Sequence, residues 1–187
     1  MSLPEAPPPE VSGHDLSVIG RQLGRAPHHM SRVAARCLYG QPAVVECLPA
    51  DLEGRPFPTL YYCTCPTLVA AVGALESAGG VRLWAERLAE TPALSASLAA
   101  AVRDTRRRRE DLLRSHNLAL LDAGASLTTG VGGVADAGAV KCLHAHVAHA
   151  LACPGYRMGD AMLAEIAQPW CDDRRCDSFV TDGAAGA

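Results

Sequence analysis

The stretch Ser31–Cys65, SRVAARCLYGQPAVVECLPADLEGRPFPTLYYCTC, decides the fold class of this chain. It contains three runs rich in β-branched or aromatic residues, separated by turns that contain glycine and proline. This pattern is typical of short strands joined by reversals. The runs are Arg32–Cys37, Ala43–Leu48 and Thr59–Cys65. The sequence therefore predicts a small antiparallel sheet over about residues 31–65.

Helical patterns flank the predicted sheet on both sides. A short helix over Asp15–Leu23 is expected before it. After it, Pro66 suits the first turn of a helix that Gly79 and Gly80 end. Further helices are expected over residues 81–90, 92–115, 140–152 and 160–167. We therefore expect a predominantly helical α+β fold, in which about five or six helices pack with the small sheet.

Length and composition indicate one domain. The chain has 187 residues, of which 49% are hydrophobic and only 4% aromatic. Such a chain can bury a core of close-packed helices without the help of disulfides. We expect a globular domain over residues 13–178, with disordered ends at 1–12 and 179–187. The glycine-rich residues 122–138 are expected to form a long loop and are a candidate functional segment.

Charge and hydropathy argue against nucleic-acid and membrane partners. The net charge is −3, from 17 basic and 20 acidic residues, which gives no basic footprint for DNA, RNA or anionic lipid. Residues 1–11 lack the features of a signal peptide, and no apolar run reaches the roughly 20 residues of a membrane helix. We expect a cytoplasmic protein, and a protein partner remains open. In that reducing compartment the eight cysteines are expected to be buried hydrophobes, reactive thiols or metal ligands.

The densest group of candidate ligands is KCLHAHVAH, residues 141–149. At about 100° per residue of a helix, Cys142, His146 and His149 would share one face, whereas His144 would point away. Thiolate and imidazole together suit zinc. The alternative is that these side chains pack on a buried helix face without a metal.

Other thiols stand at turns and helix ends. Cys65 precedes the predicted helix at Pro66, where unpaired amides favour a thiolate, so it is a candidate ligand or nucleophile. Cys37 stands at a turn, and Cys171 and Cys176 follow the last predicted helix. None of these positions by itself identifies a metal site or a nucleophile. Together they raise the question of whether the thiols lie close to one another in the fold.

Three further features have ordinary interpretations. The run Arg106–Arg109, followed by Glu110, predicts a solvated and salt-bridged helix face. The segment Gly130–Gly133 lacks the ending of a phosphate-binding loop. Cys47 lies within a predicted strand and Cys153 at a helix end, so neither is expected to be a metal ligand.

Four motifs resemble the DUF501 family, an actinobacterial family of unknown function. They are RCxxGxPxVVE from Arg36, PFPTLYYxxCP from Pro56, GVGG from Gly130 and KCLH from Lys141. The resemblance implies a bacterial cytoplasmic protein and brings no established activity. Family members often have a second cysteine where this chain has Tyr39, which argues against a local metal knuckle there. The cysteines that fall on the family pattern are Cys37, Cys65, Cys142 and Cys176, with His149 beside them.

These observations leave three functions open. In the first, Cys37, Cys65, Cys142 and Cys176 bind zinc or an iron–sulfur cluster, with His149 as a substitute ligand. In the second, Cys65 is the nucleophile of a thiol enzyme with a histidine of residues 141–149 as base. In the third, the protein is a metal-free helical interaction module. For direct ligation of one zinc, the first hypothesis predicts sulfurs within roughly 4 Å of one another.

Overall fold

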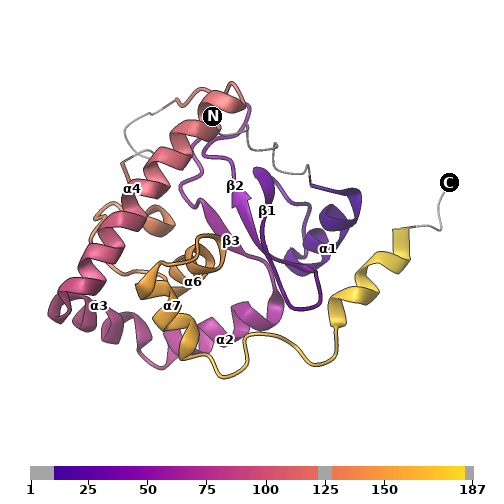
Figure 1. Ribbon diagram of the computed structural model, residues 1–187. Coiled ribbons are helices and arrows are strands. Elements are labelled where there is room, and N and C mark those ends of the chain that lie inside the picture. Colours follow the sequence, from indigo (N-terminus) through magenta and orange to yellow (C-terminus); the bar gives the residue numbers. More distant parts are fainter. Residues whose placement is uncertain (1–10, 122–127, 184–187) are drawn as a thin grey trace, which may run out of the picture.

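The computed structural model describes residues 11–121 and 128–183, and it confirms a predominantly helical α+β fold with a small antiparallel sheet (Figure 1). Residues 1–10, 122–127 and 184–187 lie outside the described part, so the predictions for the two ends and for the loop 122–138 are covered only in part. In chain order the elements are α1 (Gly13–Leu23), β1 (Met30–Arg36), β2 (Pro42–Cys47), β3 (Tyr61–Cys63), α2 (Pro66–Ser77), α3 (Gly80–Glu90), α4 (Pro92–Ser115), η1 (Val131–Gly133), α6 (Leu143–Ala152), α7 (Arg157–Ala164) and η2 (Arg175–Gly183).

The sheet has the order β1-β2-β3, and both pairs are antiparallel. Val45 of β2 lies opposite Val33 of β1 and Tyr62 of β3. Gly40 has a φ of 79° in the turn between β1 and β2, a conformation that glycine adopts without steric cost. All six residues of β2 are buried, so the central strand is covered on both faces.

Successive side chains of β2 enter two different cores. Val45 packs with Ile19 of α1 in a small cluster on one face of the sheet. Val44 belongs to the main core on the other face, together with Leu143 and Val147 of α6. Figure 1 shows the resulting layers, with α1 on one side of the sheet and the remaining α-helices on the other.

The segment after the sheet folds back as two short helices. Cys65 is the N-cap of α2, and Pro66 occupies its first turn, as the sequence predicts. Gly79 has a φ of 86°, and a Cβ on Gly80 would approach the Leu75 carbonyl oxygen to 2.6 Å, so the chain bends there. None of the described helices is by itself long and apolar enough to cross a membrane, and α2 with α3 meets that criterion only as a pair bent by 74°.

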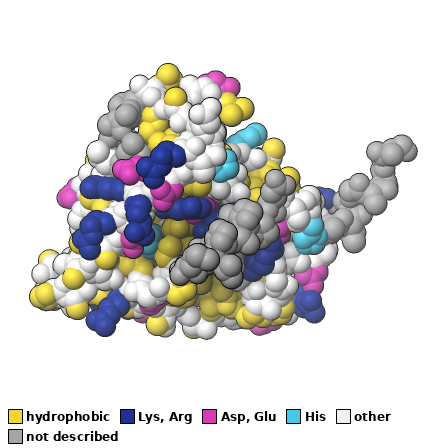
Figure 2. All heavy atoms as spheres, turned by 45° about the horizontal axis from the view of Figure 1, so that its top comes forward, with side chains coloured by type: hydrophobic (Ala, Val, Ile, Leu, Met, Phe, Trp, Pro, Cys, Tyr) yellow, Lys and Arg dark blue, Asp and Glu magenta, His cyan; other side chains and the backbone are white. Residues whose placement is uncertain are grey.

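The arginine run on α4 corrects one expectation. Some of it is solvated as predicted, since Arg107 pairs with Asp104 on the exposed side of the helix. Figure 2 shows basic and acidic side chains interspersed on one face of the molecule. Arg109, however, is 0% exposed and donates hydrogen bonds to Thr129 and to the Pro58 carbonyl. The solvated interpretation is therefore wrong for Arg109, because its acceptors come from distant loops that the local pattern does not reveal.

Candidate functional site

Four cysteines line one small cavity, hereafter the cysteine cavity, whose volume is about 10 Å³. Cys37 directly follows β1, and Cys65 is the N-cap of α2. Cys171 and Cys176 come from the segment that follows α7. The cavity thus joins the end of a strand, the start of a helix and the C-terminal segment, which lie far apart in the sequence.

The four thiols are close enough to influence one another electrostatically. Burial raises the pKa of Cys65, the amides of Leu68 and Thr67 oppose this increase, and Cys37 and Cys171 add to it. Burial also raises the pKa of Cys176. The hydrogen bond from Gln22 opposes this increase, and Cys65, Cys171 and Cys37 add to it. The neutral thiol is therefore favoured at Cys65 and Cys176 unless a cation compensates the charge of the thiolate.

Polar contacts hold the C-terminal segment against this cavity. The Gln22 amide donates to Cys176 Sγ at 3.4 Å and to the Pro42 carbonyl at 2.9 Å. Gln41 donates to Asp177 at 2.9 Å, and the Arg174 guanidinium lies 5.3 Å from the centre of the Tyr39 ring. The position of Cys176 is thus fixed by both α1 and the turn between β1 and β2.

The structure brings together three members of the predicted ligand set and places the other two elsewhere. Cys37, Cys65 and Cys176 line the cysteine cavity, but Cys142 and His149 do not. Cys171 is the additional thiol there. Two sequence features could have indicated Cys171: it is next to Trp170, which also lines the cavity, and it is close in sequence to Cys176.

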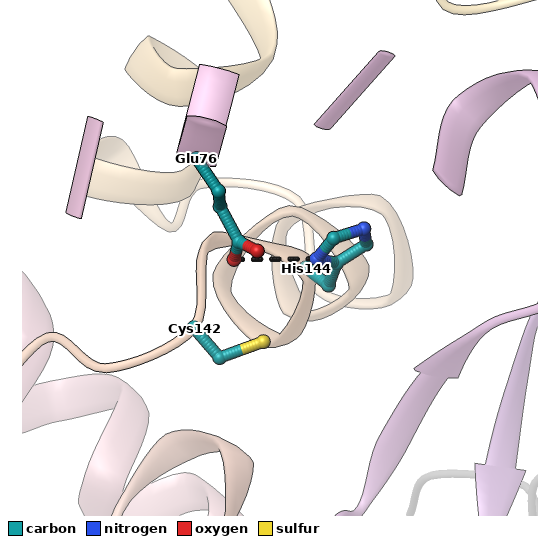
Figure 3. A group of neighbouring side chains, drawn as sticks. All are labelled: Glu76, Cys142 and His144. Atoms are coloured by element: carbon teal, nitrogen blue, oxygen red, sulfur yellow. Dashed lines mark ion pairs between the residues drawn. The ribbon is translucent and has the colours of Figure 1, made fainter. Parts of the chain in front are cut away.

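A second group consists of Glu76, Cys142 and His144, whose ligand atoms all lie within 4.8 Å of one another. Glu76 is at the end of α2, Cys142 is the N-cap of α6, and His144 is in its first turn. Figure 3 shows the Glu76 carboxylate and the Cys142 thiol directed toward the part of α6 that carries His144. Within the described residues, the four cysteines of the cysteine cavity do not contribute three sulfurs that meet the same 4.8 Å limit.

Both ring nitrogens of His144 have partners. Nδ1 lies 3.2 Å from Glu76 Oε1, and Nε2 lies 3.0 Å from the Val69 carbonyl oxygen. A carbonyl only accepts hydrogen bonds, so Nε2 carries a proton. The nearby Cys142 side chain is the largest cause that raises the pKa of His144, to about 9, with Val69 and Glu76 contributing. Glu76 Oε1 also accepts from the Leu143 amide at 2.6 Å and so caps α6.

Beside this second group lies a cavity of about 350 Å³, hereafter the tyrosine cavity, because Tyr61 and Tyr62 line it. Cys142 and His144 also line it, so two of the three side chains border open space. The glycine loop forms part of the wall, since Gly132 approaches Ala145 so closely that an added Cβ would lie 2.7 Å from the Ala145 Cβ. The segment predicted as a functional loop therefore does contribute to a cavity.

The remaining histidines of α6 are internal. His146 Nδ1 is 2.7 Å from the Tyr156 hydroxyl, and His149 Nδ1 is 3.5 Å from the Thr105 hydroxyl. Burial lowers the pKa of both to about 4, so both are neutral at pH 7.

Cys142 has the extended φ and ψ of −148° and 113°, which place it before the helix. The predicted common face of Cys142, His146 and His149 fails for this reason.

Two thiols that were expected not to be ligands do not line the cysteine cavity. Cys47 is buried in β2, and burial raises its pKa to about 12. The Cys153 thiol donates to the Tyr61 hydroxyl oxygen at 3.4 Å. All eight cysteines lie in the described part of the chain, and all are free thiols.

The fold and the two clusters define a small α+β protein rich in free thiols, with candidate metal ligands at the ends of its elements. The chain belongs to the DUF501 family of proteins of unknown function, whose model matches residues 33–164. Cys171 and Cys176 lie beyond the matched residues. No curated protein and no solved structure matches the chain.

Proposed function

We propose that the protein binds a thiolate-coordinated metal centre in the cysteine cavity, through Cys37, Cys65, Cys171 and Cys176. The observation that carries this proposal is the convergence of four thiols from three separate parts of the chain on one small cavity. Four cysteines are the complete ligand set of a structural zinc ion and also of a common iron–sulfur cluster.

The spread of the sulfurs supports a cluster over a single ion. At Zn–S bonds of about 2.3 Å, four sulfurs around one tetrahedral zinc lie about 3.8 Å apart. Among the described residues no three of these sulfurs meet even the 4.8 Å limit. A cluster with several irons takes one thiolate on each of its separate irons and so accommodates a wider set. Because the cavity has a volume of only about 10 Å³, the C-terminal segment would move outward to admit such a cluster.

The amides near Cys65 suit such a centre. Those of Leu68 and Thr67, in the first turn of α2, lower the pKa of the Cys65 thiol. The positive end of a helix dipole stabilises a thiolate in the same way. Trp170 borders the cavity and offers an apolar ring beside the site. A thiolate centre of this kind agrees with the expected cytoplasmic location, where thiols stay reduced.

The thiol-enzyme alternative has less support at this place. Cys65 would need an imidazole base within hydrogen-bond reach. The described residues that line the cysteine cavity include no histidine. We therefore place the metal centre ahead of catalysis by Cys65.

Metal and sulfide analysis of anaerobically purified full-length protein tests the proposal. We expect about four irons and four sulfides per chain with a brown absorption, or about one zinc if the centre is a single ion. Cys65→Ser and Cys171→Ser should each lose most of the bound metal, whereas Cys153→Ser, the matched control, should retain it. Wild-type protein without metal, or full metal content in both cavity variants, would overturn the proposal.

A further inference from the structure

We propose that Glu76, Cys142 and His144 form a second, independent metal site, which binds a zinc-type divalent cation and leaves one coordination position open toward the tyrosine cavity. Cys142 thus belongs to a site different from that of Cys37, Cys65 and Cys176. The group of Glu76, Cys142 and His144 shares no residue with the cysteine cavity.

The donor set is that of a zinc site. A thiolate, an imidazole and a carboxylate are all recognised zinc ligands. Their ligand atoms lie within 4.8 Å of one another, so small side-chain adjustments bring all three to bond distance of one ion. With two anionic ligands and a neutral imidazole, a divalent cation gives a site with no net charge. Such a site tolerates partial burial better than the unbalanced anionic group would.

The orientation of His144 supports ligation through Nδ1. Metal-bound histidines usually donate their second ring N–H to a carboxylate or a backbone carbonyl, which fixes the ring. Here the Val69 carbonyl accepts from Nε2 at 3.0 Å, and Nδ1 faces the carboxylate and the thiol. The Leu143 amide likewise holds Glu76 through one carboxylate oxygen and leaves the other free to bind a metal.

The open position follows from the ligand number and the neighbouring space. Three protein ligands leave one tetrahedral position free, and catalytic zinc sites differ from structural ones in this respect. Cys142 and His144 line the tyrosine cavity, and its volume of about 350 Å³ is sufficient for a small molecule. Its wall includes Tyr61, Tyr62 and Val69. The ligand that fits is water or a small molecule with an aromatic or aliphatic body and one donor atom for the metal.

Cobalt titration of full-length protein, after weakly held metal is removed with a chelator, tests this site. We expect one equivalent of Co²⁺ to produce tetrahedral visible bands and a near-ultraviolet thiolate band. Cys142→Ser should abolish the thiolate band. Glu76→Gln retains a carbonyl oxygen for the Leu143 amide, so it should keep the start of α6 while weakening Co²⁺ binding by at least about tenfold.

Controls separate this site from the cysteine cavity. Cys153→Ser should titrate like the wild type, and Cys171→Ser, which alters the other site, should keep the bands that Cys142→Ser loses. Azide should shift the visible bands of the wild type by occupying the open position. Loss of the bands in Cys171→Ser would assign the cobalt to the cysteine cavity and overturn the second site. The second site would also be overturned if Cys142→Ser and Glu76→Gln are folded and bind Co²⁺ with the same titration curve and bands as the wild type. Bands that do not respond to azide would refute the open position.

Discussion

The buried carboxylate of Glu46 joins two layers of the fold. It is 0% exposed in the central strand and forms ion pairs with Arg32 of β1 and Arg108 of α4. The two guanidinium groups bind both of its oxygens, with distances between 2.7 and 3.2 Å. A buried carboxylate is tolerated only when it is paired in this way.

Removal of this charge should destabilise the protein. In Glu46→Gln the two partly buried arginines lose their counterion, and breaking such a pair costs about 2–3 kcal/mol after a discount for their residual exposure. Urea unfolding at pH 7 measures the difference. Glu53→Gln is the matched control, because the Glu53–Arg55 pair is exposed and should contribute little. Equal stabilities of the two variants would contradict the role of Glu46.

The same carboxylate gives a pH dependence with a defined sign. Burial opposes its ionisation, but Arg108 and Arg32 hold the pKa of Glu46 below 4.5, its ordinary value. A carboxylate with a lowered folded pKa contributes stability that is present above that ordinary value and disappears as the pH falls through the folded pKa. The stability gap between wild type and Glu46→Gln should therefore narrow below about pH 4.5. A gap that stays constant from pH 7 to pH 3 would refute the ion-pair explanation.

Single residues also show where local patterns are insufficient. The sequence predicted that Cys142 shares a helix face with His146 and His149 and that His144 points away, whereas the structure places His144 beside Cys142. The prediction assumed that Cys142 lies in the helix, whereas it is the N-cap with an extended backbone. The predicted start at residue 140 is three residues before Leu143, where α6 begins, and a side chain outside the helix does not point where helical spacing would direct it.

The helices and strands could be predicted from the sequence more reliably than the metal-ligand groups, because the hydrophobic periodicity that specifies a helix or strand lies within its own residues. The three strands and the helices on both sides of them were expected, with boundaries that differ by a few residues. The strand Tyr61–Cys63 is shorter than the predicted Thr59–Cys65 because only these three residues pair with β2. Pro66 and the glycines at 79 and 80 correctly marked the limits of α2.

The close packing of α6 and α7 gives a prediction at this scale. A Cβ on Gly159 of α7 would lie 2.5 Å from the His146 carbonyl oxygen and 2.8 Å from the Ala150 Cβ. These atoms belong to a buried helix and cannot move aside easily, so Gly159→Ala should cost about 1–3 kcal/mol.

Gly73 provides the matched control for that substitution. It lies within α2 and has no heavy atom within 4 Å of an added Cβ. Gly73→Ala should therefore stabilise the protein by about 0.5–1 kcal/mol through its better helix propensity. Opposite signs for the two variants in urea unfolding are expected, and stabilisation by Gly159→Ala would contradict the close packing.

At the scale of the whole molecule, the proposed centre fastens the C-terminal segment to the sheet and to α2. Cys171 and Cys176 lie on that segment, and Cys37 and Cys65 lie on the body. Removal of the metal should increase amide hydrogen exchange in residues 171–179 and 37–41, because only a few polar contacts, most of them exposed, would then hold the segment. Exchange in α6 should change little. Equal exchange with and without metal would indicate that the centre does not fasten this segment.

The convergence of Cys37, Cys65 and Cys176 was predictable, since ends of elements tend to gather on one side of a layered domain. Cys171 was a candidate but not part of the predicted ligand set, although its place beside Trp170 was a signal for it. Its position depends on the path of the chain after α7, which no local periodicity specifies. For the same reason, the contribution of Glu76 to the second group could not be anticipated, because it is brought there by the packing of α2 against α6.

A crystal of anaerobically purified protein tests most directly whether the cysteine cavity holds a metal centre. Anomalous difference maps recorded on both sides of the iron and zinc absorption edges identify a metal and locate it. We expect a strong peak bounded by the sulfurs of Cys37, Cys65, Cys171 and Cys176, with the iron edge favoured. A cavity without an anomalous peak, in protein whose four thiols are reduced, would contradict the account.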